Sequence, residues 1–115
     1  MHGFGDFIWT SGKSYSGFYN KDLKEGLGLF YWNNPIEIYF GYWMKGQRDG
    51  PAMQILNNTK TYSIWENGKL QKSFTSKSEA LNYSFNSVNF SRKYKVFFNL
   101  DIDDLIRKFS KKTNE

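Results

Sequence analysis

The stretch Tyr15-Ser16-Gly17-Phe18-Tyr19 returns 24 residues later as Tyr39-Phe40-Gly41-Tyr42-Trp43. A weaker third copy, Thr61-Tyr62-Ser63-Ile64-Trp65, follows after another 22 residues. In the first two copies, alternate positions hold aromatic residues with a glycine between them, which is the period-2 pattern of a β-strand. The regular spacing predicts a repeat protein in which each copy begins one structural unit.

Further signals recur at fixed offsets behind each copy. A turn residue comes first, as Asp22, Gly46 and Gly68. After the turn residue comes a pair of small residues separated by one position, as Gly26/Gly28 and Gly50/Ala52. The same kind of pair, Gly3/Gly5, stands near the start of the chain. These signals therefore predict that each unit is a β-hairpin with a polar tip. Glycine weakens a strand unless its space is needed, so we expect a neighbouring ring to lie over each one.

The glycines also divide the chain. All ten lie between Gly3 and Gly68, whereas residues 75–115 hold eight basic and five acidic side chains and no glycine. We therefore expect a mainly β fold: an elongated ribbon of stacked antiparallel hairpins over residues 1–74, then a basic tail or cap over residues 75–115 with one or two α-helices. The ribbon divides into a half unit 2–14, units 15–38 and 39–60, and a degenerate half unit 61–72.

The combined pattern, Tyr-x-Gly-x-(Trp/Tyr) followed by Gly-x-x-x-Gly-x-Gly, resembles the MORN repeat (membrane occupation and recognition nexus). Asp22, Ala52, Thr61 and Ser63 depart from it. The repeat-structural positions are Gly3, Gly5, Tyr15, Gly17, Tyr19, Gly26, Gly28, Trp32, Tyr39, Gly41, Trp43, Gly50 and Trp65. The resemblance implies a non-enzymatic scaffold in a larger assembly, cytoplasmic and cytoskeleton-associated, at a cilium, a radial spoke or a protist cortical skeleton.

The tail carries helix signals at both ends. Ser76 and Glu79 form a capping box, and Asp101 with Asp104 starts a second helix. The apolar positions of that second helix are Ile102, Leu105, Ile106 and Phe109. Between the two helices, alternating apolar residues over 94–100 favour an extended segment. One helix is expected to cap the ribbon, and the other to pack on it or on another subunit.

The ribbon is apolar on both faces, and an uncovered apolar face signals an interaction site. The sequence predicts that an apolar strip on one face of the ribbon binds a helix or an extended segment of a protein partner. The residues of this strip are Phe18, Leu29, Tyr31, Phe40 and Tyr42. A second copy of the chain is one such partner.

The sequence offers no residues for catalysis, a cofactor or a metal. The chain has no cysteine, and His2 is its one histidine, without a carboxylate cluster beside it. Asp101, Asp103 and Asp104 lack the glycine and glutamate of a calcium loop and are better explained as a helix start. Nucleic acid binding is disfavoured, because the net charge of +5 is modest and the repeat accounts for the aromatic residues.

Three alternatives stay open. The resemblance extends to regulatory regions of larger enzymes, namely phosphatidylinositol-phosphate kinases and a SET-domain methyltransferase. The basic segment with Arg92, Lys93 and Lys95 is a candidate contact for an anionic membrane surface. Finally, Met1-His2-Gly3-Phe4-Gly5 begins in the second strand of a repeat, which would suit the C-terminal part of a longer array.

Overall fold

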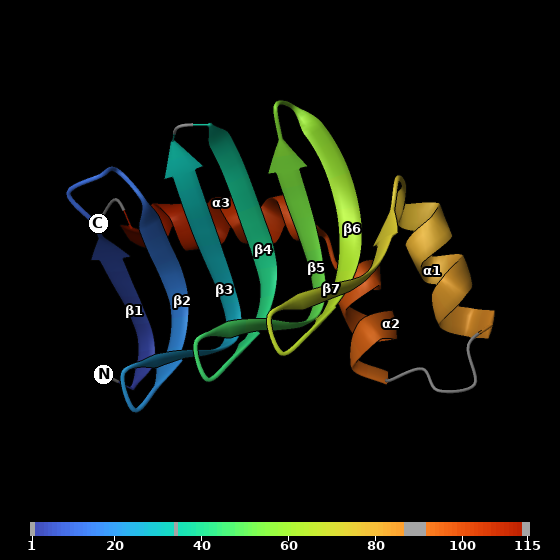
Figure 1. Ribbon diagram of the computed structural model, residues 1–115, viewed down its shortest axis with the longest axis horizontal. Coiled ribbons are helices and arrows are strands. Elements are labelled where there is room, and N and C mark those ends of the chain that lie inside the picture. The colour runs from blue at the N-terminus through green and yellow to red at the C-terminus, as the bar shows by residue number, and fades with distance from the viewer. Residues whose placement is uncertain (1, 34, 87–91, 114–115) are drawn as a thin grey trace.

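The computed structural model describes residues 2–33, 35–86 and 92–113 and measures 42 × 31 × 24 Å. Seven antiparallel strands form one open sheet in chain order, and three helices follow (Figure 1). The elements are β1 (Gly3–Ile8), β2 (Ser14–Asn20), β3 (Leu23–Asn33), β4 (Ile36–Met44), β5 (Gln47–Leu56), β6 (Thr59–Glu66), β7 (Lys69–Phe74), α1 (Lys77–Asn86), α2 (Arg92–Asn99) and α3 (Ile102–Thr113). The predicted fold class, a mainly β ribbon of stacked hairpins followed by helices, is confirmed.

A row of small residues crosses the whole sheet. In each ladder a small residue is paired with a small residue, so that the row runs Gly5, Gly17, Gly28, Gly41, Ala52, Ser63, Ser73. Aromatic residues flank this row, as where Gly3 is paired with Tyr19 and Gly26 with Trp43. The row leaves space above the sheet into which those rings lean.

Just beyond the row, the strands bend. The register shifts between Gly17 and Tyr19 and again between Gly41 and Trp43. Gly26 and Gly50, in the partner strands, have φ angles of 86° and 104°, which side-chain-bearing residues rarely adopt. A bulge together with a glycine in this conformation sharpens the local twist. The first residues of β3 and β5 therefore run across the lower end of the sheet (Figure 1).

The hairpin tips are tied together in sequence. Their turn residues have positive φ at both central positions, for example 51° at Lys21 and 65° at Asp22, as a type I′ turn requires. Three equivalent side chains, 23 or 24 residues apart, each accept a hydrogen bond from a backbone N–H of the next hairpin tip. His2 Nδ1 accepts from Lys21 (3.4 Å), Glu25 Oε1 from Lys45 (3.2 Å) and Asp49 Oδ1 from Asn67 (3.0 Å). Each hairpin is thus fastened to the one before it.

The helix starts follow the predicted caps. The backbone N–H of Glu79 donates to Ser76 Oγ at 3.2 Å, while the Glu79 carboxylate accepts from the Thr75 backbone N–H at 3.4 Å. The backbone N–H of Asp104 donates to Asp101 Oδ1 at 3.2 Å. Both predicted helices therefore form, as α1 and α3, with capping by the expected residues.

The prediction of an extended segment over 94–100 is wrong, because α2 occupies most of it, and the tail has three helices rather than one or two. Phe97 and Phe98 explain the difference. Both side chains are fully buried, and neighbouring residues in a strand would point to opposite faces of the sheet. A helix places both of them against the same apolar core.

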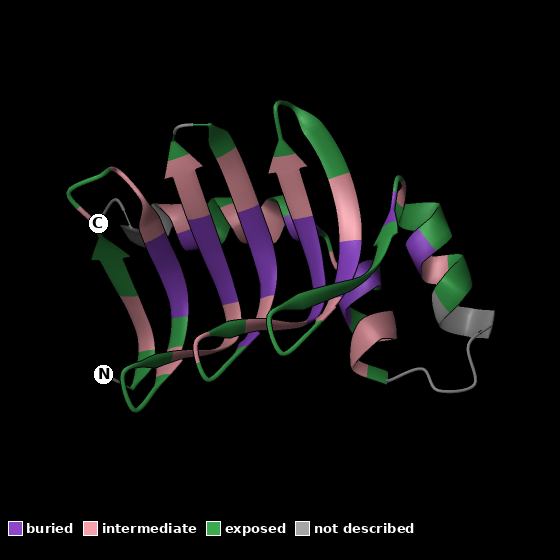
Figure 2. Ribbon diagram, viewed as in Figure 1, coloured by how far each residue is buried: buried purple, intermediate pink, exposed green. Residues whose placement is uncertain are grey.

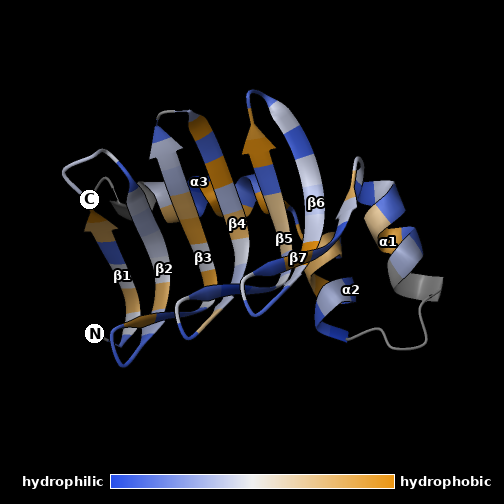
Figure 3. Ribbon diagram, in the orientation of Figure 1, coloured by the Kyte–Doolittle hydropathy of each residue, from blue (hydrophilic) through white to orange (hydrophobic). Residues whose placement is uncertain are grey.

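The core lies in two layers on either side of the sheet. All the helices pack on one face, with a core that includes Phe40, Met53, Phe97 and Phe98. The opposite face carries a cluster made of strand residues and centred on Tyr15. Figure 2 shows the buried residues as a band across the middle of the strands, and Figure 3 shows polar residues at the hairpin tips. Within the described ranges, no helix has the length and apolar character needed to cross a bilayer.

Candidate functional site

The face that the sequence predicts to bind a partner is occupied by the tail of the same chain. Leu29 and Phe40 are buried in the core shared with the helices. Tyr31 and Tyr42 are half-buried, and Phe18 is 42% exposed. The five predicted residues therefore do not form a free surface while α2 and α3 are docked.

Aromatic contacts hold the helices on this helix-bearing face. The Phe109 ring of α3 lies 5.2 Å from Phe4, 6.5 Å from Phe18 and 5.0 Å from Phe40, measured between ring centroids. The Phe97 ring of α2 lies 6.2 Å from that of Phe40. These contacts place α3 across strands β1, β2 and β4.

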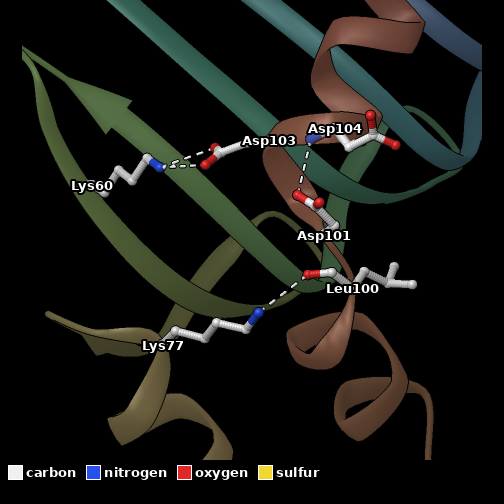
Figure 4. Close-up of polar contacts among 6 residues, drawn as sticks. All are labelled: Lys60, Lys77, Leu100, Asp101, Asp103 and Asp104. Carbon is white, nitrogen blue, oxygen red and sulfur yellow. Dashed lines mark hydrogen bonds and ion pairs between the residues drawn. The ribbon is translucent and has the colours of Figure 1, made fainter.

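Polar contacts join the helices to the sheet and to each other (Figure 4). Lys60 Nζ on β6 lies 3.0 Å from both carboxylate oxygens of Asp103 on α3. Lys77 Nζ at the start of α1 donates to the Leu100 carbonyl oxygen at 3.3 Å. Both members of the Lys60–Asp103 pair are largely exposed, so this ion pair guides the position of α3 more than it stabilises it.

The fit between α3 and the sheet is incomplete. A cavity of about 390 Å³ lies between the C-terminal half of the helix and strands β2 to β4. Its lining is Ser14, Ser16, Leu29, Tyr31, Ile38, Ile106 and Ser110. Because small hydroxyl side chains line part of it, the helix leaves room that a larger side chain could fill.

The opposite face, here called the aromatic face, is a ladder of rings. Tyr15, Phe30, Tyr39, Trp43 and Ala52 form its buried part. Trp9, Tyr19, Trp32 and Trp65 pack around them and are half-buried. This is the ring-over-glycine arrangement that the repeat predicted.

Two tyrosine hydroxyls anchor this ladder. Tyr15 donates to the Phe18 carbonyl oxygen at 3.0 Å, and the equivalent Tyr39 donates to the Tyr42 carbonyl oxygen at 2.9 Å. Burial raises the pKa of both Tyr15 and Tyr39 well above the ordinary value, and the neighbouring Tyr19 adds to the effect at Tyr15. Both residues are therefore neutral hydrogen-bond donors near neutral pH.

Two cations that were not singled out in the sequence lie over these rings. Lys24 Nζ is 5.4 to 5.7 Å from the ring centroids of Trp9, Tyr15, Phe30 and Trp43. The Arg48 guanidinium carbon is 4.6 to 5.0 Å from those of Trp32, Tyr39 and Trp65. Each cation follows the first tyrosine of its unit by nine positions, so the repeat offset was the signal that could have revealed them.

The basic residues of α2 do not point in one direction. Arg92 is exposed, whereas Lys93 and Lys95 are half-buried. Lys93 Nζ lies 4.1 Å from the ring centroid of Tyr42, so this side chain packs on the sheet. Of the three residues predicted to contact a membrane, Arg92 is thus exposed and the other two are partly exposed.

The described residues hold no cluster of three or more histidine and acidic side chains that could bind a metal ion. His2 accepts a hydrogen bond at a hairpin tip, and Asp101 caps α3. Both residues therefore have structural roles in this fold.

A ribbon of stacked hairpins with a recurring ring, glycine and tip turn defines the chain as a β-hairpin repeat protein. The family model of the MORN repeat matches residues 1–14, 15–34 and 39–58. The chain therefore belongs to the MORN-repeat proteins, a family of interaction modules that are generally non-catalytic. A comparison with curated proteins finds no match.

Proposed function

We propose that this protein is a non-enzymatic scaffold whose helix-bearing face binds an amphipathic helix of a partner protein, in exchange with α3. The partner's helix would contact the part of the strip that lies against α3, which includes Phe18, Tyr31 and Phe40. The family resemblance favours a cytoplasmic, cytoskeletal assembly as the setting, with a cilium or a cortical skeleton as the candidate location. An apolar groove that receives an amphipathic helix is a common mode of protein recognition.

The observation that carries this proposal is α3 itself. Its apolar residues Ile102 and Phe109 are buried against the sheet, while Asp103 and Arg107 remain largely exposed. The sheet thus already recognises one amphipathic helix, by the contacts that a partner's helix would use.

A partner's helix would have to replace the Phe109 contacts of α3, and two features of α3 favour such an exchange. Its ion pair with Lys60 is exposed, and the cavity beneath Ile106 and Ser110 shows that its C-terminal half does not fill the groove. A partner helix with a larger apolar side chain at the position of Ser110 would bury more apolar surface. Each additional Å² would stabilise the complex by roughly 25 cal/mol.

The experiment uses the full chain and a fluorescein-labelled peptide with the sequence of residues 101–113. Fluorescence anisotropy measures its binding to the wild-type chain and to the variant Phe109→Ala, whose own α3 is weakened. We expect tighter binding to the variant, and tighter binding still when the peptide carries Ser110→Phe.

The matched control is the same peptide with Ile102→Asp and Phe109→Asp, which keeps the length but loses the apolar face. The proposal fails if this control binds equally well. It also fails if neither chain binds the unmodified peptide at concentrations of about 1 mM, near the weak limit of specific association.

A further inference from the structure

The aromatic face presents two positive charges for which the described residues supply no ion-pair partner. Among the described residues, the ion pairs within 4.0 Å involve α3 on the other face of the sheet: Lys60 with Asp103, and Arg107 and Lys108 with Asp104. Lys24 and Arg48 instead have rings as neighbours. A half-buried cation without a carboxylate can still gain a charged hydrogen bond.

The surroundings of both cations are already partly dehydrated. Burial lowers the pKa of Lys24, and the like charge of Lys13 lowers it further. Burial also lowers the pKa of Arg48, whereas the nearby Tyr39 and Glu37 raise it. An incoming carboxylate would meet these charges in a medium less polar than water, where their attraction is stronger.

No helix within the described residues covers the aromatic face. The residues that pack against its ring cluster all belong to strands or to the end of β1, and the helices lie on the other side of the sheet (Figure 1). Beside Lys24 is a groove of about 210 Å³, lined by Phe7, Trp9, Tyr19, Asp22, Leu23, Lys24 and Gly46. Phe7 and Leu23 are each 47% exposed, so apolar surface is available next to the charge.

The spacing of the two cations restricts what can bind both. Lys24 is on β3 and Arg48 is on β5, with β4 between them, so two inter-strand steps separate the backbones of these strands by roughly 10 Å. A polyproline-type segment repeats every three residues and rises about 9.3 Å in that distance. In a flat extended strand, side chains on one face recur every two residues, or about 6.7 Å, which matches the spacing of roughly 10 Å less well.

We propose that the aromatic face binds an extended, polyproline-like segment of a partner protein that carries two carboxylates three residues apart. One carboxylate pairs with Lys24 and the other with Arg48, while the apolar residues between them pack on the exposed edges of Trp9 and Trp32. Aromatic grooves favour such segments because the segments are already extended and lose little entropy on binding. This site is on the opposite face from the groove of α3 and does not depend on exchange of that helix.

A single-stranded nucleic acid also combines negative charge with stacking, but the acidic residues around the site disfavour it. Asp22 lines the groove beside Lys24, and Glu37 lies close enough to Arg48 to affect its pKa. A phosphate backbone carries one charge at every nucleotide and would meet these carboxylates. Two carboxylates three residues apart would meet them at fewer places.

The protein contains a probe for this site. Its four tryptophans, Trp9, Trp32, Trp43 and Trp65, all belong to the ring cluster of the aromatic face. Intrinsic fluorescence of the full chain therefore reports binding there. The test ligand is a tryptophan-free peptide of four Pro-Pro-Glu repeats, titrated in low salt. We expect a saturable fluorescence change, at least tenfold weaker binding for Pro-Pro-Gln repeats, and weaker binding when glutamate occurs at every fourth position.

The variant Lys24→Gln/Arg48→Gln should reduce the affinity at least tenfold, whereas Lys24→Arg/Arg48→Lys should restore most of it. The matched control is Lys69→Gln/Lys72→Gln, an equal loss of two charges at exposed positions of β7. Circular dichroism confirms that each variant is folded. The proposal is overturned if the peptide does not bind, if Lys69→Gln/Lys72→Gln weakens binding as much as Lys24→Gln/Arg48→Gln does, or if oligothymidine binds more tightly than the peptide.

Discussion

The ring of Tyr15 occupies the space into which a β-carbon on Gly28 would project, so that these two residues fit only as a tyrosine and a glycine. We expect Gly28→Ala to destabilise the protein by about 1–3 kcal/mol, because a rigid, buried ring cannot move aside without strain. Equilibrium urea unfolding measures this loss.

A double-mutant cycle identifies the cause. In a Tyr15→Ala background, where the ring is absent, Gly28→Ala should cost much less, with a coupling of about 0.5–3 kcal/mol. Additive effects of the two substitutions would show that the overlap is not what keeps glycine at position 28.

The raised pKa values of Tyr15 and Tyr39 predict a loss of stability in alkali. In the unfolded chain both phenols ionise near the ordinary tyrosine pKa of 10.0, whereas in the folded chain burial keeps them protonated. Above pH 10 the unfolded state therefore binds fewer protons than the folded state, and the free energy of unfolding falls as pH rises. The slope should approach about 1.4 kcal/mol per pH unit for each tyrosine.

Unfolding measured between pH 9 and 12 checks this slope, and Tyr39→Phe should reduce it by the contribution of one tyrosine, because burial also raises the pKa of Tyr15, Tyr19, Tyr42 and Tyr94. At neutral pH the same variant leaves the Tyr42 carbonyl oxygen without its donor and should cost about 1 kcal/mol. If the slope is unchanged in Tyr39→Phe, other groups are responsible for the alkaline transition.

The two attachments of α3, the Phe109 ring and the Lys60–Asp103 ion pair, should contribute unequally to the free energy of unfolding. Phe109→Ala removes a ring that contacts Phe4, Phe18 and Phe40 and should cost about 3 kcal/mol. Lys60→Ala removes an exposed ion pair and should cost less than about 1 kcal/mol. Thermal or urea unfolding of the two variants compares them, and an equal loss would contradict this assignment.

The ties between hairpin tips predict a local effect. Asp49→Ala removes the carboxylate that accepts from the Asn67 backbone N–H, which should cost about 1 kcal/mol. Hydrogen exchange should quicken at the amide of Asn67, while the amide of Lys45, held by Glu25, serves as the internal control. Equal quickening at both amides would indicate general destabilisation.

Much of the sheet could be predicted because its information is local. Tyr15, Gly17 and Tyr19 alternate within one strand, and Gly28 repeats the small residue at the matching position of the next strand, which fixes the register. The starts of α1 and α3 were equally predictable, because a cap needs only residues within one helical turn.

The features that were missed depend on contacts between distant parts of the chain. Apolar residues recur at every second position from Tyr94 to Leu100, as in a strand. The core on the sheet nevertheless selects a helix, in which Phe97 and Phe98 are both buried. Likewise, Lys24 and Arg48 look like ordinary charges at hairpin tips. Only the bends at Gly26 and Gly50 carry them over the rings.

Because α3 lies across the strands, it changes how the ribbon should unfold. Stacked hairpins that contact only their neighbours open one unit at a time from the ends. Here one helix contacts Phe4 on β1, Phe40 on β4 and Lys60 on β6. Opening any one hairpin then weakens the contacts that hold the others, so the helix links units that do not touch and makes the ribbon one cooperative folding unit.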